Sequence, residues 1–183
     1  MTDPADVVDL IEADHRELER LFQLLMSQPE RRSLLLPEVA SLLVAHSRAE
    51  ESEVYPAARE AGETDEVAHS QHEHEEAEQL LERLTALDPE AAEFDDVLRD
   101  FVGAVAHHVG EEEQTVLPGL RERLSDERRK ELAVAFSTVR AEHLGDKPGE
   151  ATRDELVRKA QNADISGAAS MTKDEARKSL RED

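Results

Sequence analysis

Apolar residues recur at steps of three and four residues along most of the chain, and this spacing places them on one face of an α-helix. The first segment shows the pattern clearly, because Val7, Ile11, Leu18 and Phe22 follow one another between Pro4 and Pro29. The pattern returns in three further long segments and a shorter fifth one, at residues 37–62, 64–88, 91–116 and 126–143. Four long amphipathic helices with short connections predict an all-α fold: an antiparallel up-down four-helix bundle with a fifth shorter helix.

The composition limits the chemistry that such a bundle can carry. Aromatic residues make up 3% of the 183 residues, and no segment has the alternation of a strand. The formal net charge of −22 opposes a general electrostatic attraction to DNA or RNA. Because the chain has no cysteine, any metal must be held by nitrogen and oxygen ligands. No apolar run reaches the length of a membrane span and the N-terminus lacks a basic start, so we expect a soluble, cytoplasmic protein without a membrane partner.

The last part of the chain differs in composition from the rest. The stretch GDKPGE begins at residue 145 and is typical of a linker. After it, basic and acidic side chains are equally frequent, so the whole net charge of −22 lies in the preceding residues. We therefore predict a bundle domain, a linker and a small helix–link–helix module, over residues 1–144, 145–151 and 152–183.

Two histidine–glutamate pairs lie on the apolar stripes of the second and fourth long segments. His46 and Glu50 are four residues apart, as are His108 and Glu112, so each pair shares one helix face. A single pair of this kind is more often a solvated helix face, because the chain has eight histidines and 44 acidic residues. Both pairs here are in line with apolar residues, and buried carboxylates need compensating positive charge. Metal ions would supply it.

The first and third long segments each add one inward histidine, His15 and His74. The local sequences also match, HRELERLF from residue 15 and HEEAEQLL from residue 74, as in a duplicated helical hairpin. An antiparallel bundle would bring these side chains to a similar depth, and the predicted metal ligands are His15, His46, Glu50, His74, His108 and Glu112. Imidazole and carboxylate ligands without sulfur favour iron or manganese in a two-metal site, with zinc as an alternative.

Residues 4–123 resemble the hemerythrin family, specifically the bacterial HHE cation-binding domains, in the pattern His15, His46-x3-Glu50, His74 and His108-x3-Glu112. The resemblance implies a non-haem di-iron centre with two oxo- or hydroxo-bridged iron ions, between which Glu50 and Glu112 would be bridging ligands. His15 and His46 would serve one iron, and His74 and His108 the other. Family members bind dioxygen reversibly, sense oxygen or redox state, or handle peroxide or nitric oxide.

One position departs from the oxygen-carrying members of the family. They have a further histidine one turn before the ligand of the third helix, where this chain has Ser70 with Gln71 beside it. The missing ligand predicts an open or water-filled position at one iron, and it favours peroxide chemistry or sensing over simple oxygen storage.

The remaining histidines and the single tyrosine are expected outside the ligand set. On a regular helix His69 and His72 point about 140–160° away from His74, so neither replaces the missing ligand. His107 is about 100° from the ligand face and is expected to flank it. Tyr55, nine residues after His46, falls on the opposite side of a regular helix and is expected to pack against apolar residues.

The C-terminal module has two capping-box starts, Thr152 with Glu155 and Thr172 with Glu175. It resembles the small SAP-like N-terminal module of the transcription termination factor Rho, which would imply nucleic-acid contact through Arg153, Arg158, Lys159, Lys173, Arg177 and Lys178. The balance of charges and the lack of aromatic residues oppose such contact. A protein partner is the expected use of this module.

These observations predict a di-iron protein that binds dioxygen or a related small oxidant, with a role in oxygen binding, sensing or the response to oxidative stress. Its small ligands would be O2, peroxide or nitric oxide. Two alternatives stay open: a catalase-like enzyme that decomposes peroxide at the same centre, and a helical interaction scaffold whose tail binds a partner. No side chain outside the metal ligands is predicted to be catalytic.

Overall fold

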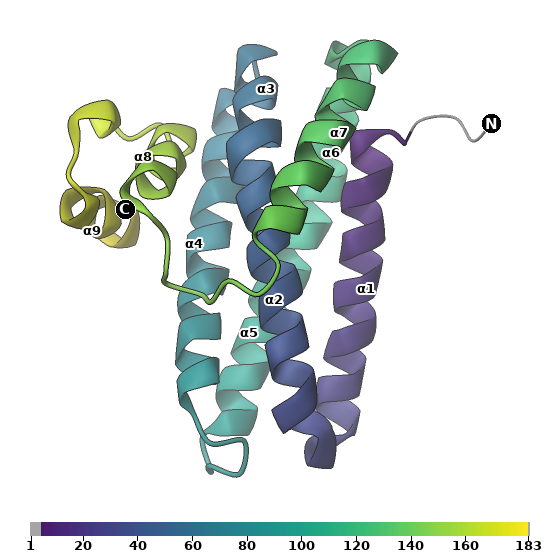
Figure 1. The fold of residues 1–183 in the computed structure, drawn as a ribbon, viewed down its shortest axis with the longest axis vertical. Helices are drawn as coiled ribbons and strands as arrows, with labels where there is room; N and C mark the ends of the chain where they lie inside the picture. Colours follow the sequence, from purple (N-terminus) through teal and green to yellow (C-terminus); the bar gives the residue numbers. More distant parts are fainter. Residues whose placement is uncertain (1–4, 183) are drawn as a thin grey trace.

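The computed structural model describes residues 5–182, which contain helices and turns but no strand (Figure 1). The body of the molecule consists of four long helices, α1 (Val7–Ser27), α2 (Arg32–Ala49), α4 (Thr64–Ala86) and α5 (Phe94–Gln114). The other elements are η1 (Pro29–Arg31), η2 (Glu50–Val54), α3 (Tyr55–Glu60), α6 (Val116–Arg123), α7 (Asp126–Glu142), α8 (Arg153–Asn162), η3 (Ala168–Ser170) and α9 (Lys173–Glu182). None of the described helices is both long enough and apolar enough to cross a membrane.

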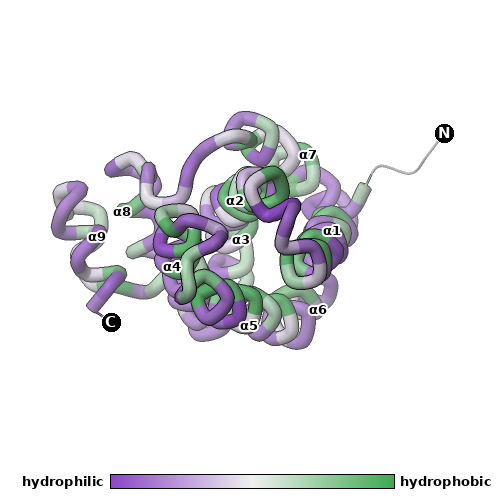
Figure 2. The backbone as a smooth tube through the Cα atoms, turned by 90° about the horizontal axis from the view of Figure 1, so that it is seen from below, coloured by the Kyte–Doolittle hydropathy of each residue, from purple (hydrophilic) through white to green (hydrophobic). Residues whose placement is uncertain are grey.

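The four long helices form an up-down bundle, and Figure 2 views it from one end, down the axes of the helices. α1 packs against α2, α2 against α4, α4 against α5 and α5 against α1, so the helices close a ring around one interior. α7 lies outside α1 and α2, and α8 and α9 lie beside α4 (Figures 1 and 2). The prediction of an all-α bundle with a fifth shorter helix and a C-terminal helical pair is confirmed.

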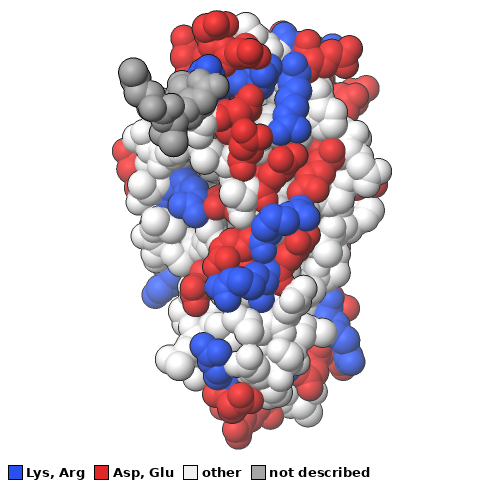
Figure 3. Space-filling model, turned by 90° about the vertical axis from the view of Figure 1, so that its right-hand side faces the viewer, with Lys and Arg blue, Asp and Glu red and all other residues white. Residues whose placement is uncertain are grey.

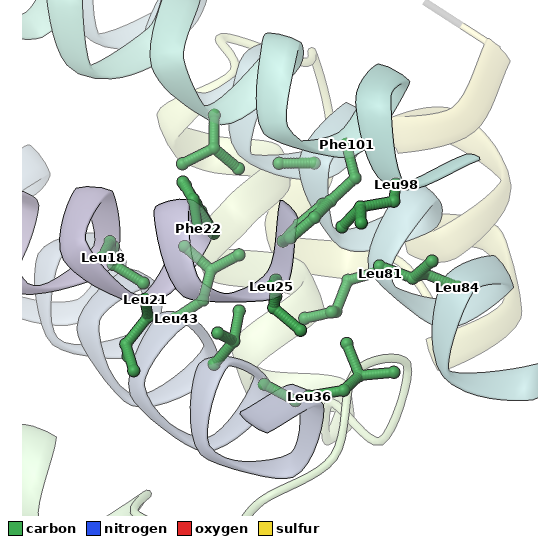
Figure 4. Packing of buried hydrophobic residues seen from close by; sticks show 14 of the residues in the cluster. Leu18, Leu21, Phe22, Leu25, Leu36, Leu43, Leu81, Leu84, Leu98 and Phe101 are labelled. Carbon is green, nitrogen blue, oxygen red and sulfur yellow. The ribbon is translucent and has the colours of Figure 1, made fainter. Parts of the chain in front are cut away.

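Buried apolar residues form two clusters, one on each side of the middle of the bundle. The first cluster joins all four long helices through residues such as Leu21, Leu81 and Phe101 (Figure 4). The second cluster includes Ile11 from α1 and Phe136 from α7. Each fully buried side chain of this kind contributes about 1.5–3 kcal/mol relative to an exposed one. The residues between the two clusters are therefore sealed from solvent on both sides.

Capping side chains fix where α1 and α7 begin. The expected first turn at Pro4 lies outside the described residues, and α1 begins at Val7. Asp6 is its N-cap, because its Oδ1 accepts a hydrogen bond of 2.9 Å from the backbone N–H of Val8. Ser125 caps α7 in the same way.

α2 begins at Arg32, so Pro37 lies inside the helix, and the prediction that Pro37 opens it was wrong. Arg32 explains the early start. Its buried guanidinium donates to the carbonyl of Leu25 at 3.1 Å and pairs with Asp95 at 2.8 Å. These tertiary contacts anchor the turn before Pro37 and offset the one backbone hydrogen bond that proline cannot donate.

The second long segment contains a π-helical turn, η2, between α2 and α3. The N–H of Tyr55 donates to the carbonyl of Glu50, five residues back instead of four. Pro56 follows directly, and the wider turn relieves the crowding that its ring would cause in a continuous α-helix. The extra residue rotates every later side chain of the segment by about 100° relative to a regular helix.

The fourth long segment is also interrupted near a proline. α5 ends at Gln114, and Thr115 leaves the helical conformation with φ −123° and ψ −78°. The chain returns to helix at Val116, which places Pro118 in the first turn of α6. A proline in the first turn needs no hydrogen-bond partner for its nitrogen, so the break satisfies Pro118 without loss.

The C-terminal helices have a small core of their own, formed by Ala151, Leu156, Val157, Ala160, Ala163, Ala168, Ala176 and Leu180. Both predicted capping boxes are present. The hydroxyl of Thr152 accepts from the N–H of Glu155 at 3.3 Å, and that of Thr172 accepts from the N–H of Glu175 at 3.3 Å. The glutamate of each box accepts in return from the threonine N–H.

Lys159 links α8 to the bundle. Its side chain is only 1% exposed, and its Nζ lies 3.7 Å from Oε1 of Glu51 and also pairs with Glu78. Asn162 donates from Nδ2 to the carbonyl of Glu51 at 2.9 Å and to Oε1 of Gln71 at 3.1 Å. Lys159 is therefore not available for the nucleic-acid contact that the resemblance to the Rho module implied for it.

Candidate metal centre

The six residues that the sequence singled out lie together in the middle of the bundle, between the two apolar clusters. None of them is more than 5% exposed. They come from all four long helices and the start of η2: His15 from α1, His46 and Glu50 from α2 and η2, His74 from α4, and His108 and Glu112 from α5. The structure thus brings together side chains that are up to 97 residues apart in the sequence.

Glu50 lies at the centre of the group. Its Oε2 is 3.2 Å from Nε2 of His46 on α2 and 3.2 Å from Nε2 of His74 on α4, so it faces a histidine from each of two helices. Glu112 has a less symmetric position, because its Oε2 is 3.3 Å from Nε2 of His15 but 3.9 Å from Nε2 of His108.

The potential ligand atoms divide into two overlapping groups. Within each group they all lie within 4.8 Å of one another, and Glu50 belongs to both. The groups are His15, His46, Glu50 and Glu112, and Glu50, His74 and His108. Two ions could therefore be held side by side, with Glu50 placed to contact both.

Every histidine of the centre makes a contact from its outer nitrogen, Nδ1, to a carboxylate. The four pairs are His15 with Glu113 at 2.9 Å, His46 with Asp14 at 3.1 Å, His74 with Glu51 at 3.2 Å, and His108 with Glu73 at 3.0 Å. A carboxylate on Nδ1 orients the ring, holds the proton on that nitrogen and leaves Nε2 as the basic atom. All four imidazoles therefore turn Nε2 toward the interior.

The four outer carboxylates share one arrangement, in which a residue of one helix contacts a histidine of the neighbouring helix. Each is the sequence neighbour of one candidate ligand, and each pairs with the histidine of the next helix around the bundle. Asp14, for example, precedes His15 on α1 but contacts His46 on α2. Adjacent residues point about 100° apart on a helix, so a neighbour of an inward ligand faces the adjoining helix. The sequence reasoning missed these four residues, although an acidic neighbour recurs at each candidate site.

The carboxylates make positive charge favourable inside the bundle. Burial alone would lower the pKa of His46, but Glu50 and Asp14 outweigh it and raise that pKa to about 10. The pKa of His74 rises to about 9 for the same reason, against burial and through Glu50 and Glu51. Protons or a bound cation can meet this demand for positive charge.

Several buried atoms of the centre have no hydrogen-bond partner: Nε2 of His15, both carboxylate oxygens of Glu50, and Oε2 of Glu112. Each such atom costs on the order of 1–3 kcal/mol, and more when it is charged. Neighbouring donors on one ion with bonds of about 2.0–2.2 Å lie about 3 Å apart. The spacing of 3.2–3.3 Å between these atoms and their neighbours fits ligands of a shared cation.

Tyr55 lies in the centre, and the expectation that it would pack away from the ligands was wrong. Its hydroxyl donates to Oε1 of Glu112 at 3.1 Å and lies 3.0 Å from Nε2 of His74. The π-helical turn η2 is the cause, because it turns the tyrosine from the far side of the helix toward the interior. Burial, followed by the charges of Glu112 and Glu50, raises the pKa of the phenol.

The structure places the other histidines outside the centre. His69 and His107 are exposed, and both face Glu73, at 3.4 and 3.2 Å. Ser70, at the position of the missing histidine, is buried. Gln71 is also buried, and it donates to Oε1 of Glu51 at 3.0 Å, so it supports the carboxylate that orients His74.

A four-helix bundle whose interior gathers histidines and glutamates from every helix defines a metal-binding helical protein. Residues 6–120 match the family model described as hemerythrin HHE cation binding domain, and the chain belongs to this family. The chain is also similar to a Nostoc sp. protein named DNA nickase, with 31% identity over 152 residues. That similarity covers 80% of this chain but only 42% of the relative, so the chain spans less than half of the relative's length. No solved structure matches the chain.

Two elements beyond the family match support the histidines from outside. From α7, Arg140 holds both oxygens of Asp14, at 2.7 and 2.8 Å, and Asp14 contacts His46. From α8, Lys159 holds Glu51, which contacts His74. Each half of the centre therefore depends on a helix that follows the matched range.

Proposed function

We propose that this chain holds two iron ions at the candidate centre and binds dioxygen or a related small oxidant there, in oxygen binding, sensing or the response to oxidative stress. The observation that carries the proposal is the convergence of four imidazole Nε2 atoms on two buried glutamates, with every outer nitrogen paired to a carboxylate. Iron would supply a Lewis-acidic, redox-active centre for such an oxidant.

The six ligands would be His15, His46, Glu50, His74, His108 and Glu112. Glu50 would contact both ions, because it belongs to both groups of ligand atoms. The two apolar clusters exclude bulk water from either end. Exclusion of water strengthens the electrostatic interactions of the carboxylates and protects a reactive oxidant from side reactions.

Tyr55 is the side chain placed to act on a ligand or to join the ligand set. Its hydroxyl donates a hydrogen bond to Glu112 in this structure, and it could instead turn its oxygen toward an ion held near His74. It thereby offers an oxygen atom to the half of the centre where the sequence lacks a fifth histidine.

The space beside the centre favours a very small ligand. A cavity of about 10 Å³ touches His74. The other residues that line it are Leu43, Val44, Ser47, Arg48, Ala77, Glu78 and Leu81. A volume of about 10–15 Å³ is the least that holds one water molecule. This cavity therefore has no room for an organic substrate, and any ligand that enters it must be close to a water molecule in size.

Anaerobic loading with Fe2+ tests the proposal. We expect two iron ions per chain and an optical change when oxygen is admitted, and we expect neither in Glu50→Ala. Glu53→Ala, which changes a nearby acidic residue outside the ligand set, serves as the matched control. A chain that folds normally but takes up no iron would favour the alternative of a helical interaction scaffold.

The behaviour of the loaded protein separates the carrier from the enzyme. If the optical change reverses when oxygen is removed, the protein binds oxygen reversibly. Sustained evolution of oxygen from added peroxide would identify the catalase-like alternative. Since both outcomes need iron, each must disappear in Glu50→Ala.

DNA is a second candidate partner, because the relative from Nostoc sp. is named a DNA nickase. The net charge of −22 opposes DNA binding, and on the α1 side of the molecule basic side chains are interspersed with acidic ones (Figure 3). The buried ligands also lie out of reach of a phosphodiester. Incubation with supercoiled plasmid and Mg2+ or Mn2+ is the test. Nicking that is lost in Glu50→Ala would replace oxidant binding as the function.

The C-terminal module is proposed to be a support for the centre first and a partner-binding unit second. The division of the chain at residues 145–151 and the resemblance to the Rho module stay predictions. The docking through Lys159 and Asn162 favours the first role, because both residues reach Glu51 beside His74.

A further inference from the structure

A separate group of potential ligands lies on the surface where α4 and α5 run side by side. His69 and Glu73 occupy successive turns of α4, and His107 comes from α5. Their ligand atoms all lie within 4.8 Å of one another. We propose that these three residues hold a divalent transition-metal ion, at a cation site distinct from the buried centre.

Glu73 is the residue that points to a ligand. Its side chain is 9% exposed, and its Oε1 is buried with no hydrogen-bond partner. Its other oxygen, Oε2, is taken by Nδ1 of His108 at 3.0 Å. A buried carboxylate oxygen without a partner is costly, so Oε1 requires a positive group at the point that it faces.

The two histidines surround that point. Nε2 of His69 lies 3.4 Å from Oε1 of Glu73, and Nε2 of His107 lies 3.2 Å from the same atom. Donors bound at about 2.0–2.1 Å to one tetrahedral ion lie about 3.3–3.4 Å apart. The observed separations match this geometry.

The donor set selects the class of ion. Two imidazoles with one carboxylate suit Zn2+ or Co2+, which such donors bind more tightly than Fe2+, whereas Mg2+ and Ca2+ prefer oxygen ligands only. The side chains of His69 and His107 are 61% and 64% exposed, so the remaining coordination positions face water. An ion at this site would therefore exchange directly with solvent, which the buried centre does not allow.

Glu73 also connects the two sites. Oε1 faces the surface site, and Oε2 orients His108 of the buried centre. A cation on Oε1 withdraws charge from the carboxylate that makes His108 a good donor. Binding of an ion at the surface site would thus weaken the contact of Glu73 with His108 in the buried centre.

Metal titration of the full chain tests the proposal, with Zn2+ for stoichiometry and Co2+ for visible absorption. We expect the wild type to bind one more ion per chain than H69Q/H107Q, and to show a four-coordinate Co2+ band that this variant lacks. H69Q alone or H107Q alone should lower the affinity of this site for its ion by at least about tenfold. H72Q changes a histidine of the same helix outside the group and should behave as the wild type.

Equal stoichiometry, with affinities within about twofold, in the wild type and H69Q/H107Q would overturn the proposal and leave His69 and His107 as simple ion-pair partners of Glu73. The E50A/E112A variant separates this result from the proposed function. It should keep one ion that is lost when H69Q is added, whether or not the buried centre binds iron.

Discussion

The hydroxyl oxygen of Tyr55 lies 3.0 Å from Nε2 of His74, about the distance between adjacent ligands of one octahedral ion. The pair joins α3 to α4 through the interior, and it exists because η2 adds one residue to the turn before Tyr55. A tyrosine oxygen thus lies in the half of the centre whose expected second histidine is Ser70. The π-helical turn η2 thus brings the hydroxyl oxygen of Tyr55 into the centre.

Tyr55→Phe should change the spectrum of the loaded protein more than its iron content. A phenolate on ferric iron produces a visible charge-transfer band, which the variant would lack while its six other ligands remain. Absorption spectra at equal iron content, compared with those of the wild type, are the measurement. Identical visible spectra would show that Tyr55 acts only as a hydrogen-bond donor to Glu112.

Glu50→Ala and Glu112→Ala should differ in severity. Glu50 belongs to both groups of ligand atoms, so its loss should remove both ions, whereas Glu112→Ala should leave the ion near His74 and His108. Each lost ion also removes binding free energy from the folded state, so the melting temperature of the loaded protein should fall in the same order. Metal analysis and thermal unfolding provide the two readouts. Equal iron loss in both variants would contradict the central position of Glu50.

Helical periodicity was sufficient to predict the fold, because each long helix shows one apolar face and the connections are short. The same periodicity placed His46 with Glu50 and His108 with Glu112 on inward faces, and so the location of the centre followed from local sequence alone. The start of α2 at Arg32 could not be predicted in this way, because it depends on the contact of Arg32 with Asp95, 63 residues further along the chain.

The outer carboxylates and Tyr55 could not be singled out in the same way. The chain has 44 acidic residues, so four that orient histidines are hidden among many that face solvent. Tyr55 was misplaced because a regular helix was assumed across Pro56, where the structure has a π-helical turn. Lys159 contacts Glu75 across 84 residues, and no local pattern distinguishes it from the exposed lysines of the same module.

Lys159→Met should release α8 from the bundle and destabilise the chain. The substitution removes the buried ammonium that Glu51, Glu75 and Glu78 share, and leaves them only the guanidinium groups of Arg48 and Arg181. Breaking a buried ion pair costs about 3–5 kcal/mol. Urea unfolding and proteolysis of the C-terminal helices would measure the effect, with the exposed Lys173→Met as the matched control. A loss of free energy below about 0.5 kcal/mol would mean that α8 does not depend on this contact.

Because Glu51 also orients His74, Lys159→Met should reach the metal centre. We expect weaker binding of the ion near His74, by about 10–100-fold, with the ion near His15 and His46 less affected. A stepwise titration with iron measures the affinity of each of these two ions separately. An unchanged titration would show that Gln71 and Arg48 hold Glu51 in place without Lys159.

Glu63 should make the stability of the protein fall as the pH rises. The carboxyl is 3% exposed beside Gly119, where an added Cβ would lie 1.2 Å from its Oε1, and its Oε2 has no hydrogen-bond partner. Burial raises the pKa of Glu63 from 4.5 to about 7, although Arg123 partly opposes the shift.

The direction of this pH dependence follows from proton binding. Between pH 4.5 and about 7 the folded protein keeps a proton on Glu63 that the unfolded chain has released, so the free energy of unfolding declines through this range. Glu63→Gln removes the decline and should raise the free energy of unfolding at pH 8 by about 1–3 kcal/mol, with little change at pH 4.5. Urea unfolding at both pH values, with the exposed Glu60→Gln as control, measures it. A variant no more stable than the wild type at pH 8 would show that Arg123 keeps Glu63 ionised at no cost.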